Sequence, residues 1–249
     1  KGNLFAIKRF DYFKKKATKN NTRGAFCLKA DIKHYFDEVN HNILLNILKD
    51  KIKDVDLMNI IYKIVKNCAN SRTQRERERE INSWLEEPKG MPLGNLTSQF
   101  FANVYLSRMD YFIKHILKVK YYIRYVDDFV ILHNSKKQLI VWKEQINSFL
   151  KDKLKIELHP YKSRIVSLYR GVDFVGFRNF YNYKLLRKRN VSGMRRKIEL
   201  YKKGFIGFES IFNSYQGWKA YAVWGNTYKL RKEIKREIIN LLWGKIKFE

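Results

Sequence analysis

Two adjacent aspartates inside an apolar run constrain the fold of this chain more than any other feature. Residues 121–132 read YYIRYVDDFVIL, with Asp127 and Asp128 between β-branched and aromatic residues. Such flanks favour strands, so the sequence predicts two short strands joined by a tight turn that carries both acids. Neighbouring carboxylates raise each other's pKa unless a cation lies between them, and Mg²⁺ suits such a site. The alternative is a solvated turn, which the apolar flanks argue against.

A third acid ends another short apolar stretch. Residues 26–36 read FCLKADIKHYF, which predicts a strand with Asp31 near its end. A lone acid at a strand end is more often a helix cap or a surface residue. The long interval between Asp31 and Asp127 nevertheless leaves room for helices that would bring the two strands together.

A loop rich in glycine precedes a helix within residues 89–106, KGMPLGNLTSQFFANVYL. Its glycines allow a ligand to approach the backbone closely, and Thr97 or Ser98 is expected to cap a helix that begins near Gln99. A loop of this kind at a helix N-terminus suits a phosphate. An ordinary loop and helix start would explain the same residues.

Two further elements are predicted after the aspartate turn. Ser135 is expected to cap a helix that packs on the sheet. A hairpin is predicted from Ile165 to Phe177, with its turn near Arg170 and Gly171.

The charge balance indicates a polyanionic partner. The 249 residues include 52 Lys and Arg against 24 Asp and Glu, a formal net charge of +28. No run approaches the roughly 18 apolar residues of a membrane-spanning helix, so nucleic acid is favoured over a membrane. The densest basic stretch, residues 184–203, predicts a phosphate-binding face. Its candidate residues are Lys184, Arg187, Lys188, Arg189, Arg195, Arg196 and Lys197.

The N-terminus and the cysteines give expectations about context. The first residues, KGNLFAIKRFDYFKKK, contain no signal-peptide core or cleavage site, and Cys27 and Cys68 are the only cysteines. We therefore expect a reducing, cytoplasmic compartment. From the start without Met we expect either that a larger protein has been cut or that an upstream part is missing.

The order of these motifs resembles the reverse transcriptase family. DIKHYF is followed by GMPLGNLTSQFFAN, then by YVDD, Lys162 and VDFVGF, across nearly the whole chain. The resemblance implies an α+β fold: a polymerase palm, an antiparallel sheet packed on helices, with partial fingers over residues 1–178, and a basic, mostly helical thumb over residues 179–249. It also implies an RNA-directed DNA polymerase that adds dNTPs to a DNA or RNA primer on an RNA template.

The resemblance also assigns roles to individual residues. Those implied to be catalytic or to bind two Mg²⁺ ions are Asp31, Ile32 through its carbonyl, Asp127, Asp128 and Lys162. Those implied to bind the nucleotide are Phe36, Leu93, Gly94 and Gln99. Lys162 matches the lysine that assists pyrophosphate departure, and Phe36 matches the bulky residue that excludes a 2′-hydroxyl.

One motif departs from the common form of the family. Leu93, Ser98 and Gln99 stand where most members have Gln before the glycine and Ser-Pro after it. This variant resembles the polymerases of diversity-generating retroelements, which copy RNA with frequent errors at adenine and work with a small basic accessory protein. Group II intron and retron polymerases are the alternatives. A catalytically incomplete RNA-binding fragment is another, because few residues precede Asp31, although all three acids are present.

Overall fold

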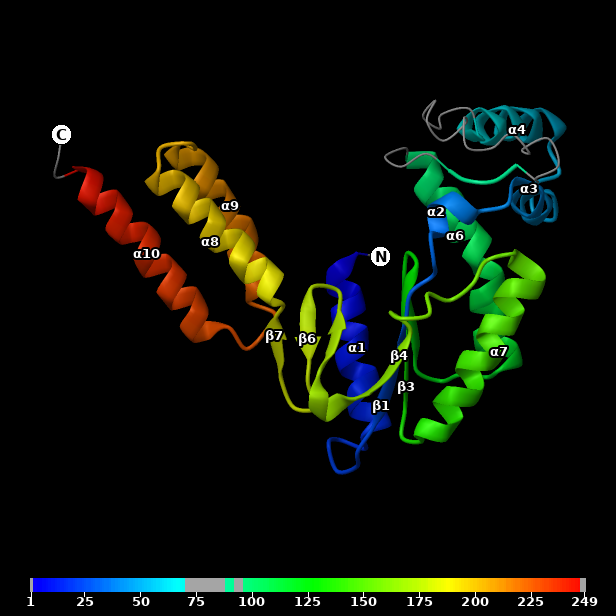
Figure 1. Cartoon of the computed structure of the whole chain (residues 1–249), viewed down its shortest axis with the longest axis horizontal. Helices are drawn as coiled ribbons and strands as arrows, with labels where there is room; N and C mark the ends of the chain where they lie inside the picture. Colours follow the sequence, from blue (N-terminus) through cyan, green and yellow to red (C-terminus); the bar gives the residue numbers. More distant parts are fainter. Residues whose placement is uncertain (1, 70–87, 92–95, 247–249) are drawn as a thin grey trace. The chain divides into compact units, whose positions relative to one another are not determined.

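The chain folds into two compact units, each described here by itself. The computed structural model describes residues 2–69, 88–91 and 96–246 (Figure 1). The aspartate unit is Ala25–Ile165, and the terminal unit combines Lys1–Gly24 with Val166–Glu249. Helices and antiparallel strands are both present, so the predicted α+β class is confirmed. The domain boundary predicted near Asn179 lies inside the terminal unit and stays a prediction.

A four-stranded sheet organises the aspartate unit. In spatial order its strands are β2 (Tyr122–Tyr125), β3 (Asp128–His133), β1 (Phe26–Ala30) and β4 (Arg164–Ser167). β3 is antiparallel to β1 and β2, with Ala30 opposite Phe129 and Tyr125 opposite Asp128. This register places the end of β1 beside the start of β3. Asp31 therefore follows its strand next to the turn that carries Asp127 and Asp128.

The helices of this unit share one buried core with the sheet (Figure 1). They are α2 (Tyr35–Glu38), α3 (His41–Lys49), α4 (Val55–Ala69), α6 (Leu96–Tyr111), its π-helical extension Phe112–Ile116, and α7 (Lys136–Leu154). Leu139 and Ile146 of α7 share one buried core with Leu28 and Ile131 of the strands. The predicted cap of α7 is confirmed, because the Ser135 hydroxyl oxygen accepts a hydrogen bond from the backbone N–H of Gln138 at 3.3 Å.

The start of α6 corrects the sequence prediction. The helix begins by Leu96, so Thr97 and Ser98 lie in its first turn and do not cap a helix near Gln99. The Ser98 hydroxyl is buried, and within the described part of the chain it has no hydrogen-bond partner. Leu93 and Gly94 lie outside the described residues.

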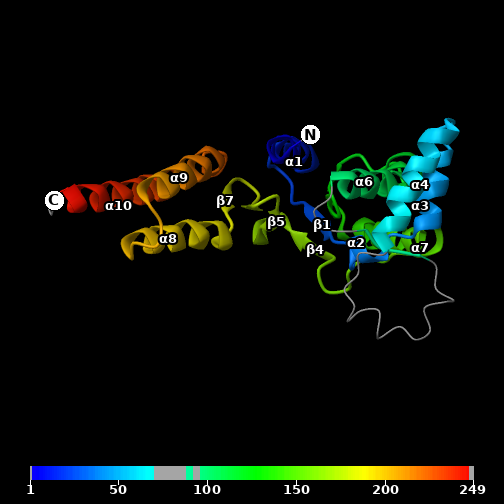
Figure 2. The same cartoon turned by 90° about the horizontal axis from the view of Figure 1, so that it is seen from above.

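The terminal unit joins an N-terminal helix to a small sheet and three further helices. These elements are α1 (Asn3–Ala17), the 3₁₀ turn Leu168–Arg170, β5 (Val172–Phe174), β6 (Phe177–Asn179), β7 (Lys184–Leu186), α8 (Lys188–Lys202), α9 (Phe208–Ala222) and α10 (Tyr228–Ile246). Ile7 of α1 shares a core with Phe177 and Leu186 of the sheet. α8 packs against α9 and α10 around Ile198 and Ile211 (Figure 2).

The predicted hairpin has its turn elsewhere. β5 and β6 pair Phe174 with Phe177, so the turn lies at Val175–Gly176 and not near Arg170 and Gly171. Gly176 has a φ of +71°, which only glycine adopts without strain, and a Cβ there would collide with the Tyr221 hydroxyl. That hydroxyl donates a hydrogen bond to the Val175 carbonyl at 2.6 Å, which holds the turn.

None of the helices in the described ranges combines the length and the hydropathy that crossing a membrane requires.

Candidate active site

The backbone at Asp31 is fixed by a segment from the other end of the aspartate unit. The backbone N–H of His159 donates to the Asp31 carbonyl at 2.8 Å. The buried Ser163 hydroxyl accepts from the Asp31 N–H at 3.3 Å and donates to the Asp31 carbonyl at 3.2 Å. These contacts hold Asp31 at the end of β1. Sequence reasoning missed Ser163, and its position next to Lys162 was the available signal.

Lys162 reaches this acid directly. Its Nζ lies 3.0 Å from Oδ2 of Asp31. The hydrogen bond and charge of Asp31, with smaller effects of Asp127 and Asp128, raise the pKa of Lys162. The structure therefore places a protonated lysine beside the acids, as the sequence motif suggested.

The turn between β2 and β3 carries the other two acids in a strained backbone. Val126, its first central residue, has a φ of +58°, a region that β-branched residues rarely adopt. Burial, and then the charge of Asp31 and a hydrogen bond with it, raise the pKa of Asp127. Burial also raises the pKa of Asp128, with Lys29 opposing and Asp31 adding to the shift. The three aspartates thus lie close enough to repel one another.

Arg124 of β2 holds the turn by hydrogen bonds, and sequence reasoning missed this residue. Its guanidinium donates to both carboxylate oxygens of Asp110 on α6, at 2.9 and 2.6 Å. It also donates to the Val126 carbonyl and to Oδ1 of Asn103, each at 2.9 Å. The Tyr122 hydroxyl completes the network with a 2.6 Å hydrogen bond to Asp110. A single arginine in an otherwise apolar strand was the signal in the sequence.

The three carboxylates supply the hard oxygen donors that a divalent cation prefers. Among the described residues, however, no group of three or more His, Cys, Asp or Glu side chains is arranged to hold a metal. Lysines supply the compensating charge instead: Lys162 pairs with Asp31, and Lys29 Nζ lies 3.7 Å from Oδ1 of Asp128. The raised pKa values of Asp127 and Asp128 show that added positive charge would stabilise the ionised group. The donor chemistry fits a divalent cation, provided that these lysines move.

The predicted nucleotide-binding residues are placed less completely. Phe36 is half-buried on α2, with its ring edge-on to Tyr35 at 5.5 Å. Gln99 lies exposed in the first turn of α6, and its carbonyl accepts a hydrogen bond from the Asn103 side chain at 2.9 Å. Asn103 in turn contacts Arg124. The side chain of Ile32 is buried, and its carbonyl as a metal ligand stays a prediction.

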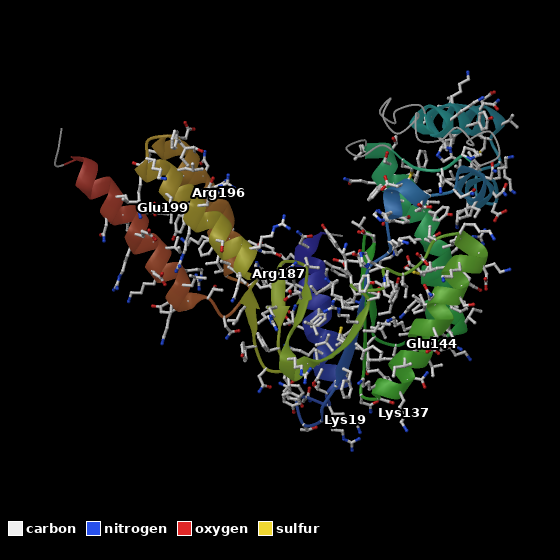
Figure 3. All side chains as sticks on the ribbon, viewed as in Figure 1. Lys19, Lys137, Glu144, Arg187, Arg196 and Glu199 are labelled. Atoms are coloured by element: carbon white, nitrogen blue, oxygen red, sulfur yellow. The ribbon has the colours of Figure 1, made fainter. Side chains whose placement is uncertain are left out.

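The predicted basic residues lie in the terminal unit and differ in their surroundings. Lys188, Arg189 and Arg196 are exposed, and Figure 3 shows Arg196 on α8. Arg187 lies 3.4 Å from Asp173, Arg195 lies 2.7 Å from Glu233, and Lys197 donates to Ser214 at 2.8 Å. Lys184 is largely buried, paired with Asp11 and 5.8 Å from the ring centroid of Phe177. Its ammonium is already engaged inside the unit.

Known proteins resemble this chain over most of its length. The family model for "Reverse transcriptase (RNA-dependent DNA polymerase)" matches residues 3–179. Protein YkfC of Escherichia coli (strain K12) is 24% identical over 209 residues, which cover 71% of this chain and 51% of YkfC. Group II intron-encoded protein LtrA of Lactococcus lactis subsp. cremoris is 25% identical over 225 residues, which cover 65% of this chain and 36% of LtrA. The chain therefore spans about half of these relatives or less.

Solved structures share the fold. Telomerase from Candida albicans, in complex with a fragment of telomeric RNA, superposes with a TM-score of 0.60 at 13% identity, covering 99% of this chain and 44% of that one. Apo telomerase from Candida tropicalis gives a TM-score of 0.53 at 16% identity, covering 100% of this chain and 46% of that one. At these identities the likeness is one of fold alone, and it confirms the predicted polymerase-like architecture.

Proposed function

This chain belongs to the reverse transcriptase (RNA-dependent DNA polymerase) family, and we propose that it adds dNTPs to the 3′ end of a DNA or RNA primer on an RNA template. The observation that carries the proposal is the meeting of Asp31, Asp127 and Asp128 beside Lys162. A cluster of three partly exposed acids is costly to keep, because burial and the charge of Asp31 raise the pKa of Asp127 and Asp128. In cation-dependent nucleotidyl transfer, such a cluster would serve to bind the divalent cations.

The aspartates have the central role in this reaction. Two Mg²⁺ ions bound by Asp31, Asp127, Asp128 and the Ile32 carbonyl would supply activation of the primer hydroxyl and charge stabilisation at the phosphates. The protein itself positions the acids. The Ser163 hydroxyl hydrogen-bonds to the Asp31 backbone, and Arg124 hydrogen-bonds to the Val126 carbonyl of the turn.

Lys162 and the flanking residues complete the proposed reaction. Asp31 raises the pKa of Lys162 and so favours its charged ammonium, which can donate a hydrogen bond to departing pyrophosphate. Phe36, with Leu93, Gly94 and Gln99, is proposed to contact the incoming nucleotide. The exposed basic residues from Arg187 to Lys197 are proposed to bind the phosphates of template and primer.

We also propose that the chain is the error-prone polymerase of a diversity-generating retroelement, acting with a small basic accessory protein. The support is the variant motif at Leu93, Ser98 and Gln99. A group II intron polymerase is the second candidate, and the similarity to LtrA favours it. The error rate opposite template adenine in sequenced cDNA separates the two. A several-fold lower rate in Leu93→Gln would support the first, and an unchanged low rate in both proteins would support the second.

Primer extension on an RNA template with Mg²⁺ tests the polymerase proposal. The chain and an upstream-extended version are each compared with Asp127→Asn and with Asp56→Asn, a control acid that lies exposed on α4. We expect Asp127→Asn to abolish extension and to leave RNA affinity nearly unchanged, with Asp56→Asn behaving like the parent. Parental activity in Asp127→Asn would remove the proposed role of the aspartates.

A further inference from the structure

The terminal unit carries a compact group of aromatic and basic side chains that the proposed reaction does not use. We call it the tyrosine platform, and its members are Tyr169, Arg170, Arg178, Phe180, Tyr181 and Tyr183. They come from the 3₁₀ turn before β5, from β6 and from the β6–β7 turn. The loop that follows α1 adjoins them, because the Tyr181 hydroxyl donates to the Arg23 carbonyl at 2.6 Å.

The first stack in the platform consists of one buried ring, Tyr181, and one exposed ring, Tyr169. The rings of Tyr169 and Tyr181 are stacked, with centroids 4.6 Å apart and planes 16° apart. Tyr181 is only 7% exposed and is held by its hydrogen bond to Arg23, whereas Tyr169 is 64% exposed. A planar group could therefore stack on the open side of Tyr169 without any rearrangement of the ring beneath it.

The second stack lies on a turn that a backbone hydrogen bond closes. Phe180 and Tyr183 are stacked at 4.6 Å with planes 20° apart, and Tyr183 is 44% exposed. The backbone N–H of Phe180 donates to the Tyr183 carbonyl at 2.8 Å, which closes the turn. The guanidinium of Arg178 lies 5.7 Å from the Phe180 ring centroid. Two partly exposed stacks thus lie within one short stretch of chain.

Three exposed cations lie on the segments that carry these rings and on the adjoining loop after α1. Arg170 and Arg178 are exposed, and Arg178 donates to the Arg170 carbonyl at 2.9 Å. Lys19 is also exposed, and Figure 3 shows it on the loop after α1. Within the described part of the terminal unit, the ion pairs use other cations, and none involves these three. The platform is therefore a positively charged surface.

We propose that the tyrosine platform binds single-stranded RNA, with unpaired bases on the open tyrosine rings and phosphates on the arginines and Lys19. Bases stack on aromatic side chains when they are unpaired, whereas a duplex keeps its base faces internal. An acidic peptide would use the cations and leave the ring faces without a role. Lys184, which follows Tyr183, points into the core of the unit, so the platform is distinct from the basic residues of α8.

This surface does not depend on the polymerase proposal, because binding is measured without dNTPs. The probes are a dye-labelled uridine homopolymer, which stays unpaired, and an RNA duplex of the same length, read by fluorescence anisotropy with the full chain. The test variant is Tyr169→Leu/Tyr183→Leu, which keeps apolar bulk and removes the rings. The matched variants are Tyr169→Phe/Tyr183→Phe, which keeps the rings, and Tyr111→Leu, which removes an exposed stacked tyrosine of the aspartate unit.

We expect Tyr169→Leu/Tyr183→Leu to weaken binding of the homopolymer by at least about fivefold. That factor corresponds to the loss of a single stacked base at the low end of the usual stacking energy. Duplex affinity should change by less than about twofold, since the phosphate contacts remain. The phenylalanine pair and Tyr111→Leu should bind like the parent. In Arg170→Gln/Lys19→Gln, the slope of log affinity against log salt should fall by roughly 0.7 for each phosphate that the protein no longer neutralises.

Three results would overturn the proposal. The first is parental homopolymer affinity in the leucine pair, and the second is an equal loss for the homopolymer and the duplex. The third is competition by polyglutamate as effective as competition by RNA of equal charge, which would indicate a surface for acidic proteins.

Photocross-linking to RNA with 4-thiouridine should map to residues 168–183 of the parent, and this measurement needs no variant to fold. Asp127→Asn should retain homopolymer binding, so failure of the polymerase proposal remains distinguishable.

Discussion

Removing Arg124 should separate the stability of the aspartate unit from the positioning of its catalytic turn. The Arg124 side chain is 11% exposed, and its partner Asp110 is 33% exposed. Breaking a buried pair by removing one partner costs about 3–5 kcal/mol, because the other charge is left uncompensated. Since Asp110 is partly exposed, we expect Arg124→Met to lower the free energy of unfolding by about 3 kcal/mol, the lower end of that range.

A second substitution should restore the stability without restoring activity. Asp110→Asn removes the stranded charge and still offers an oxygen to the Tyr122 hydroxyl. The double variant Arg124→Met/Asp110→Asn should therefore recover to within about 1 kcal/mol of the parent. Its turn, however, still lacks the Arg124 donor that holds the Val126 carbonyl in place. We expect primer extension to stay impaired.

Urea unfolding and primer extension, measured on the same preparations, check both parts. Arg124→Lys serves as a control that keeps the charge and removes the two-pronged hydrogen bonding to Asp110. Recovery of both stability and extension in the double variant would refute the assignment of Arg124 as a positioning residue. A loss below about 1 kcal/mol in Arg124→Met would show that the pair is effectively solvated.

Three further predictions concern single positions. Asp127→Asn should raise the melting temperature at neutral pH, because a carboxyl with a raised pKa stabilises the fold when protonated and loses that contribution as pH rises through its pKa. This increase in melting temperature should disappear in strong acid, where Asp127 is protonated. An equal increase in strong acid would contradict the prediction. Gly176→Ala should lower the free energy of unfolding by at least about 1 kcal/mol, because the φ of Gly176 is positive. Adding Tyr221→Phe removes the colliding hydroxyl and should restore part of that free energy, which urea unfolding of the double variant would measure. Phe36→Ala should admit ribonucleotides, measured as rNTP incorporation, and parental selectivity would move the sugar-excluding residue elsewhere.

Local patterns in the sequence were enough to predict much of the aspartate unit. Alternating apolar and aromatic residues located both strands around Asp127 and the end of β1 before Asp31. The register of β1 against β3 then brings the acids together. These features depend on side chains close in sequence, which is why they could be predicted.

The errors arose where a distant partner decides between equal local signals. Gly171 and Gly176 both have positive φ, 78° and 71°, and both suit a turn, but only pairing with β6 selects Gly176 as the hairpin turn. Lys184 matched a basic surface by composition, yet Asp11 from the N-terminal helix engages it inside the unit. Arg124 received no role from the sequence, because its partner Asp110 lies on α6 and not near it in the strand.

The terminal unit is built from both ends of the chain, and this sets an order for its formation. Hydrogen bonds join Lys14 to Phe180 and Tyr181 to Arg23, so α1 finds its partners only after residues 166–186 have been made. During synthesis on the ribosome, all of Ala25–Ile165 emerges earlier and can close first. Until residues 166–186 have been made, Ile7 and Phe10 of α1 lack the β5, β6 and β7 side chains that they contact in the terminal unit. A nascent chain that ends before Val166 would therefore lack residues 166–186, against which α1 packs in the terminal unit.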